Sequence, residues 1–147
     1  MPISNPSYNP TSIISKASDE TVNNSQVPQD DDDLHFPVVI NQNYVFTGYL
    51  LCSSSTTADI KITFDVPANT DMYWKETDVT ETLTYSSGTY LPIPGHGVDS
   101  YNLTVIQGVI TVGDTAGTVT LQWSQYLAEV SNAKMREGST FIYTKTT

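Results

Sequence analysis

The chain has 147 residues, with sixteen acidic residues against six basic ones and a formal net charge of −10. This length fits one domain with a single hydrophobic core. A chain this acidic is a poor ligand for phosphate backbones and anionic lipid, so we expect no nucleic-acid partner and no membrane partner. No run in the sequence approaches the roughly 18 apolar residues of a membrane span.

The first segment, residues 1–17, reads "MPISNPSYNPTSIISKA" and carries three prolines among asparagine and serine. Proline fixes φ and removes a backbone donor, which excludes a helix here. Because the segment also holds large apolar side chains, we interpret it as an extended arm that anchors on a partner surface, and a frayed tail is the alternative. The predicted domain spans residues 18–147. The candidate anchors of the arm are Ile3, Tyr8, Ile13 and Ile14.

From residue 18 onwards, apolar and polar side chains alternate with a period of two, which is typical of half-buried strands. The segment "ADIKITFDV" (58–66) shows this pattern, and "GTVTLQWSQY" (117–126) repeats it and places Trp123 among core residues. "YVFTGYLLC" (44–52) is apolar on both faces in places, which is typical of a central strand of a sandwich. Further strands are predicted at 20–26, 34–40, 71–76, 79–85, 101–113 and 139–145.

These segments predict an all-β fold, a jelly-roll-like sandwich of about eight strands with the extended arm at its N-terminus. Residues 126–137 hold at most one turn of helix, and 92–97, "PIPGHG", are predicted as a turn. Pro37 should confine its strand to a sheet edge or a bulge. Gly48 and Gly108 lie within predicted strands, where a bulge or a close backbone contact is the usual reason.

Four consecutive aspartates at 30–33 stand directly before the apolar alternation of residues 34–38. Calcium binding needs about six to eight oxygens from a loop with alternating ligands and a turn-forming glycine, and that pattern is missing here. We interpret the run as a solvated acidic turn that leads into a strand, and a weak cation site is the alternative. His35 and His96 lie far apart and lack ligand spacing, so no metal and no cofactor are expected.

No catalytic constellation is apparent, and we do not expect an enzyme. A G-x-S-x-G motif is missing, and "GDTAGT" lacks the lysine and the helix of a phosphate-binding loop. Cys52, the single cysteine, is expected to be a buried, inert thiol at a strand end. Exposed aromatic side chains remain as candidates for a glycan-binding or subunit-contact surface. These candidates are Trp74, Tyr85 and Tyr90.

The chain from about residue 18 to 145 resembles a β domain of tailed-phage virion proteins, which recurs in head-decoration proteins and in the distal parts of tail fibres. The likeness lies in "SDETVNNS", "DDDDLHFPVVINQNYVFTGYLLCSSSTTADIKITFDVPA", "GVITVGDTAGTVTLQWSQ" and "REGSTFIY". The resemblance implies a jelly-roll-like module that forms a homotrimer and serves assembly or adhesion without catalysis. It also implies that the aspartates mark the entry to a strand.

Two functions follow from this resemblance. A tail fibre would carry a shaft of coiled-coil, collagen-like or β-helical repeats, and residues 1–147 contain none. We therefore expect a capsid decoration, or cement, protein on the exterior of a virion, with the major capsid protein as its partner. Binding several shell subunits at once would stabilise the assembled shell. The alternative is a tail-fibre or other receptor- or glycan-binding adhesion module.

Overall fold

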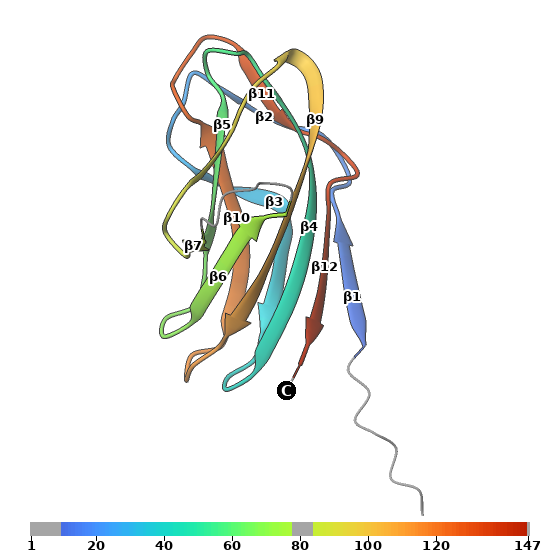
Figure 1. The fold of residues 1–147 in the computed structure, drawn as a ribbon, viewed down its shortest axis with the longest axis vertical. Helices are drawn as coiled ribbons and strands as arrows, with labels where there is room; N and C mark the ends of the chain where they lie inside the picture. The colour runs from blue at the N-terminus through green and yellow to red at the C-terminus, as the bar shows by residue number, and fades with distance from the viewer. Residues whose placement is uncertain (1–9, 78–83, 147) are drawn as a thin grey trace, which may run out of the picture.

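The computed structural model describes residues 10–77 and 84–146 of the chain. Two antiparallel sheets pack face to face as a sandwich, and the described residues form no helix (Figure 1). The predicted all-β, jelly-roll-like sandwich is confirmed. Within the described part of the chain, no helix is long and apolar enough to cross a membrane.

The larger sheet has eight strands, all paired antiparallel. Its main path runs in the order β1 (Thr11–Ser15), β12 (Thr140–Lys145), β4 (Asn43–Ser54), β9 (Gly97–Thr111), β6 (Asp71–Glu76) and β7 (Tyr85–Ser86). Two further strands join it beside β4, namely β11 (Asn132–Met135) and, paired to β11, β2 (Glu20–Asn23). The long strands β4 and β9 lie at the centre of this sheet, so they fix the positions of the others.

The smaller sheet has four strands in the order β3 (Gln29–Val38), β10 (Gly117–Gln125), β5 (Ile60–Asp65) and β8 (Leu91–Ile93). Strand β3 lies at its edge, as Pro37 predicts, because proline cannot donate to a second neighbour. The register between β10 and β3 shifts between Thr120 and Gln122. This irregularity lies opposite the segment of β3 that contains the four aspartates.

Aromatic rings fill the space between the sheets. The ring of Phe64 lies 5.1 Å from Trp74, 5.4 Å from Phe46 and 5.9 Å from Phe141, measured between centroids. Trp123 on β10 is fully buried, as predicted. A Cβ atom on Gly108 would come within 2.5 Å of the backbone carbonyl oxygen of Tyr73 and within 2.6 Å of the Phe46 ring, so glycine is required there. The expected close contact at this strand glycine is confirmed.

The N-terminal segment differs from the prediction. Thr11–Ser15, which falls within the arm predicted at 1–17, forms β1 and pairs with β12 from Thr11↔Thr144 to Ser15↔Thr140. Ile14 turns inward and packs against the core, so it is held by its own domain and is not free to anchor on a partner. Residues 1–9, with Ile3 and Tyr8, lie outside the described residues. The sheet therefore begins seven residues before residue 18, where the domain was predicted to begin.

Three strands were not predicted from the sequence. They are β1, β8 and β11. Strand β8 overlaps the first two residues of the segment predicted as a turn, and β11 lies in the segment predicted to hold a turn of helix. Each is short and is fixed by pairing with a distant strand, a contact that local sequence does not reveal. Of the strand predicted at 79–85, residues 79–83 lie outside the described residues.

Candidate interaction surface

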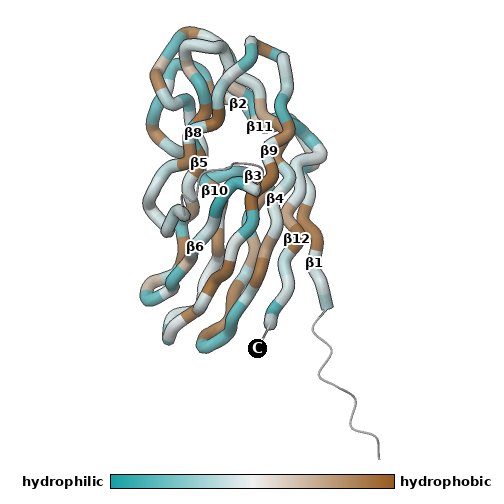
Figure 2. Tube along the Cα trace, viewed as in Figure 1, coloured by the Kyte–Doolittle hydropathy of each residue, from teal (hydrophilic) through white to brown (hydrophobic). Residues whose placement is uncertain are grey.

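The outward surface of the larger sheet carries large apolar side chains in water. Six of them are between 40% and 67% exposed, and they come from β1, β4, β6 and β9. Hydrophobic stretches recur along these neighbouring strands (Figure 2). Contiguous exposed apolar surface on a soluble domain usually marks an interaction site. We call this surface the open face and define it by Ile13, Val45, Tyr49, Tyr73, Leu103 and Val109.

The strand register aligns these side chains across the sheet. Val45 lies opposite Val109, and Val109 lies opposite Tyr73, so three strands present one continuous apolar row. On the other side of β4, Ile13 of β1 lies opposite Ile142 of β12. Directly opposed side chains in a sheet touch, which makes the rows single surfaces and not scattered contacts. The open face thus extends from the edge strand β1 to β6, and the polar residues Lys75, Gln107 and Thr47 form one row within it.

A shallow groove of about 560 Å³ runs over the open face. Tyr73 lines it on one side, and Thr11 and Ile142 line it on the other. Thr47 and Gln107, which lie opposite each other on β4 and β9, add polar groups between these sides. The groove combines an exposed aromatic ring with an amide and a hydroxyl, so its chemistry suits a protein surface or a sugar.

The negative charge of the chain is distributed unevenly over the two sheets. The outward surface of the smaller sheet carries Asp30 and Asp32 on β3 and Asp65 on β5, all exposed. On the larger sheet, two carboxylates border the open face: Asp71 lies at the start of β6, and Asp99 forms an ion pair of 2.6 Å with Lys134. The outer face of the smaller sheet therefore carries exposed carboxylates, whereas the outer face of the larger sheet carries exposed apolar side chains with Thr47, Gln107 and Lys75 among them.

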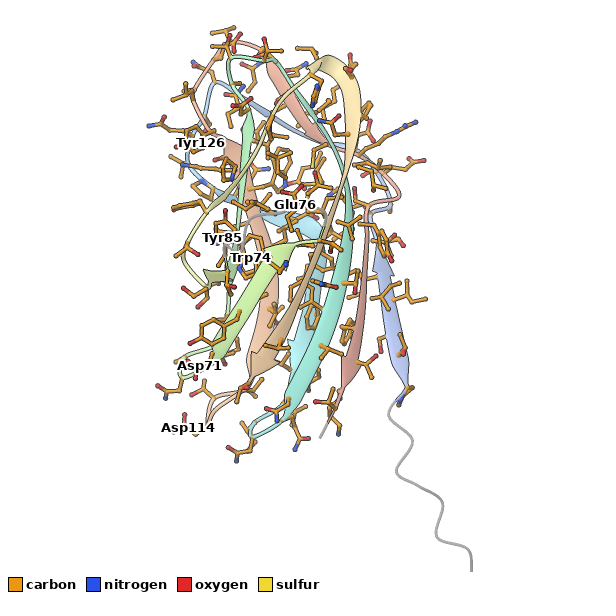
Figure 3. All side chains as sticks on the ribbon, in the orientation of Figure 1. Asp71, Trp74, Glu76, Tyr85, Asp114 and Tyr126 are labelled. Carbon is orange, nitrogen blue, oxygen red and sulfur yellow. The ribbon has the colours of Figure 1, made fainter. Side chains whose placement is uncertain are left out.

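The aromatic residues predicted as a contact surface do not form one. Trp74 is 1% exposed and belongs to the core, so its predicted role as an exposed contact is wrong. Tyr85 is half-buried and packs on Trp74 with ring centroids 5.1 Å apart (Figure 3). Tyr90 is exposed, and the Lys61 ammonium lies 4.8 Å from its ring centre, beside the smaller sheet.

The alternation of side chains along β6 shows which aromatic residue of this strand is exposed. Met72 and Trp74 point inward and are buried, while Tyr73 and Lys75 point outward. A period of two assigns Trp74 to the same side as the apolar Met72. The exposed aromatic residue of this strand is therefore Tyr73.

The four aspartates also differ from the prediction, since they lie within β3 and one of them is buried. Both oxygens of Asp31 are used: Oδ1 accepts from Lys16 Nζ at 2.9 Å, and Oδ2 accepts from Trp123 Nε1 at 3.1 Å. The backbone N–H groups of Asp33 and Leu34 also donate to Oδ1. The run is therefore no solvated turn, because Asp31 is a buried part of the sandwich.

The cation among these carboxylates is the ammonium of a lysine. The ammonium of Lys16 lies 2.9 Å from Asp31 Oδ1 and 2.9 Å from Glu20 Oε2, with Asp33 at 3.9 Å. The side chains of Lys16 and Asp31 are both fully buried. Among the residues that the structure describes, no group of histidine, cysteine and acidic side chains is arranged to hold a metal ion.

Burial and pairing act against each other on this cluster. Burial lowers the pKa of Lys16, but its hydrogen bonds to Asp31 and Glu20 outweigh that effect and raise the pKa above the ordinary value. Burial raises the pKa of Glu20, and the hydrogen bond from Lys16 only partly offsets the rise. Lys16 directly follows β1, whereas Asp31 is on β3, so a charged contact joins the root of the N-terminal strand to the smaller sheet.

Cys52 is a buried thiol, as predicted. It is 2% exposed, and its Sγ lies 3.5 Å from Met135 Sδ. Burial raises the pKa of Cys52 to about 12. The thiolate, which is the reactive form, is therefore not populated at neutral pH.

No family model matches this chain, and no curated protein matches its sequence. Among solved structures, it is similar to that of infectious bursal disease virus Gx strain, with 10% identity and a TM-score of 0.32 over 94% of this chain and 40% of that one. It is also similar to the VP2 subviral particle of infectious bursal disease virus, with 11% identity and a TM-score of 0.28 over 95% of this chain and 42% of that one. The chain thus spans about two fifths of the length of these proteins. At TM-scores this low, the likeness assigns neither a family nor a function.

Proposed function

We propose that the chain is a structural protein of a virus particle, a trimeric decoration protein that binds the exterior of a tailed-phage head shell. The observation that carries the proposal is the open face. It leaves large apolar side chains in water on a chain whose net charge is −10, while the carboxylates of the described residues lie elsewhere or at its border. Such a surface is unfavourable on a lone domain and useful in an assembly. This role requires no cofactor and no catalysis.

The N-terminal segment is the proposed contact to the major capsid protein. Because Thr11–Ser15 belongs to the sheet, the arm is shorter than the sequence suggests and ends at Pro10, with Ile3 and Tyr8 as its candidate anchors. Ile13 follows on β1 and is 67% exposed, so it extends the apolar surface from the arm onto the body.

An arm that is bound to the shell transmits force to the segment where it joins the domain. Two contacts hold this segment in the structure. Strand β1 is paired to β12 over five residues, so a force along the arm loads these backbone hydrogen bonds together. Immediately beyond β1, the buried Lys16–Asp31 pair ties the same segment to β3. A load on the arm is thereby passed to both sheets of the sandwich.

Three copies would present three arms to neighbouring shell subunits. When one arm is bound, the others are held near their own sites, and their effective concentration rises. The assembled shell is then stabilised by mass action, even where each arm binds weakly.

The test is a deletion of residues 1–10, which leaves every described strand intact. The full chain and the truncated chain are each mixed with undecorated heads and sedimented together. We expect the full chain to sediment with heads and the truncated chain to stay in the supernatant, with unchanged thermal unfolding. Asn5→Ser, which alters the arm but neither of its apolar anchors, is the matched control and should still bind. Binding by the truncated chain at full occupancy would remove the arm from the proposal.

A glycan-binding adhesion module is the second candidate, and one observation favours it. The groove on the open face offers the ring of Tyr73 with Gln107 and Thr47 beside it, and this chemistry suits a sugar. This function needs the groove to be open in the assembled protein. Binding of the protein to a glycan array, lost in Tyr73→Ala and retained in Tyr90→Ala, would support it over the decoration role.

A further inference from the structure

The edges of the two sheets are protected unequally against pairing with another chain. Exposed sheet edges are usually blunted by charge, by proline or by short length. In the smaller sheet, β3 carries Asp30, Asp32 and Pro37, and β8 has only three residues, of which one is Pro92. In the larger sheet, β7 has two residues, and β2 has four, of which Glu20 is acidic.

Strand β1 has none of these devices. Its five residues, "TSIIS", include neither charge nor proline, and no strand of the described residues pairs with its outer side. Ile13 at its middle is 67% exposed. The least protected edge of the molecule thus adjoins its most apolar face.

The area of the open face is smaller than the area that a stable interface buries on each partner. Five strands from β1 to β6 at about 4.8 Å spacing span about 19 Å, and six residues along β4 rise about 20 Å, which gives a footprint of about 400 Å². The largest patches on monomers are about 300–600 Å² and are often functional. A stable interface buries about 800 Å² on each partner, so the contact must extend beyond this face. The edge of β1 is the neighbouring apolar surface.

Charge indicates the chemistry of the partner. A basic partner would be drawn to the acidic outer face of the smaller sheet, where Asp30, Asp32 and Asp65 are exposed. An acidic partner would be repelled there and accepted on the open face, where carboxylates only border the apolar rows and Lys75 points outward. A second copy of this chain, with its charge of −10, is such a partner.

We propose that the open face is the subunit interface of this protein and that further copies of the chain cover it. The open faces turn toward a common axis, and the β1 edge of each copy adjoins the next copy. In a closed ring, each copy contacts its two neighbours through different surfaces. This arrangement uses both the open face and the β1 edge, each of which is too small to form a stable interface alone. The inference rests on the proposed self-association, but the identity of the interface is a separate claim.

The test places a lysine on the open face and the same lysine elsewhere. Val109→Lys is the test variant, and Val39→Lys is the matched control, because the two valines are 52% and 54% exposed and Val39 follows β3 of the smaller sheet. The mass of each full chain is measured by light scattering behind a sizing column. We expect about 48 kDa, three times the chain mass of 16.1 kDa, for the wild type and for Val39→Lys, and 16.1 kDa for Val109→Lys.

Each outcome separates the two claims. If the wild type and both variants are trimers, the open face is not the interface and the trimer stands. If the wild type is a monomer at every concentration, both proposals fail. Dissociation of Val39→Lys as well would overturn the assignment to this face. Circular dichroism checks that each variant is folded, and Ile13→Lys, on the exposed side of the edge strand, replaces Val109→Lys if the latter does not fold.

Discussion

Replacing Lys16 with methionine tests how the N-terminal strand is held. Methionine keeps most of the volume of the side chain and removes the ammonium. Asp31 would then remain fully buried with three neutral donors, the backbone N–H groups of Asp33 and Leu34 and the indole N–H of Trp123. Glu20 would lose the same partner.

The magnitude follows from the burial of the pair. Breaking a buried ion pair by removing one partner costs about 3–5 kcal/mol, because the other charge is left uncompensated. The free energy of unfolding of a domain of this size is about 5–15 kcal/mol, so a large part would be lost. With a denaturant slope of about 2 kcal/mol per molar urea, the unfolding midpoint should fall by about 2 M.

The assay is urea unfolding followed by tryptophan fluorescence, since Trp123 donates to Asp31 and reports on the site directly. Lys134→Met is the matched control, because Lys134 also forms an ion pair, with Asp99, but at an exposed position. Its midpoint should hardly move. Lys16→Met combined with Asp31→Asn should be less destabilised than Lys16→Met alone, since the amide carries no charge and its oxygen can still accept from the backbone N–H groups of Asp33 and Leu34. An unchanged midpoint for Lys16→Met would refute the reasoning that this pair locks the N-terminal strand to the sandwich.

Three further predictions follow from single sites. Gly108→Ala should lower the free energy of unfolding by about 1–3 kcal/mol, since the added carbon would lie 2.5 Å from the Tyr73 carbonyl oxygen and 2.6 Å from the Phe46 ring; thermal melting measures the loss. The raised pKa of Lys16 means that its stabilisation is complete below its ordinary pKa of 10.5 and is lost as pH rises through the folded-state value, so stability measured across alkaline pH should fall more steeply in the wild type than in Lys16→Met. Cys52 should resist a thiol reagent in the native protein at pH 8 and react fully in urea, and rapid native labelling would contradict its burial.

Alternation predicts those strands whose two faces differ in polarity. The strand 71–76 was predicted with its bounds correct, and the apolar side of β5 is buried as its sequence indicates. The sequence of β4 is apolar on both sides, which predicts burial of both. The structure buries Phe46 and Leu50 but leaves Val45 and Tyr49 exposed, because no element of the described residues covers the outer surface of the larger sheet. A single sequence does not distinguish an apolar side chain on an exposed surface from one that is buried in the core.

The features that the sequence did not predict have a common cause, because they depend on contacts between residues that are far apart in the chain. In "TSIIS", Ile13 and Ile14 are adjacent, so no alternation marks β1, and the strand exists because β12 pairs with it. Asp31 can be buried because Lys16 pairs with it, and the two side chains come into contact only in the folded structure, where β3 lies beside the end of β1. Lys16 and Asp31 can each be read from the sequence, but the sequence does not show that their side chains touch.

The copy number of this chain in purified particles of the proposed virus tests the decoration role most directly. Quantitative mass spectrometry would compare it with the major capsid protein of the same particles. A decoration protein that covers the shell should be present in numbers of the same order as the shell subunit. A small handful of copies per particle, or none, would contradict the account and would place the chain at a tail tip or outside the particle.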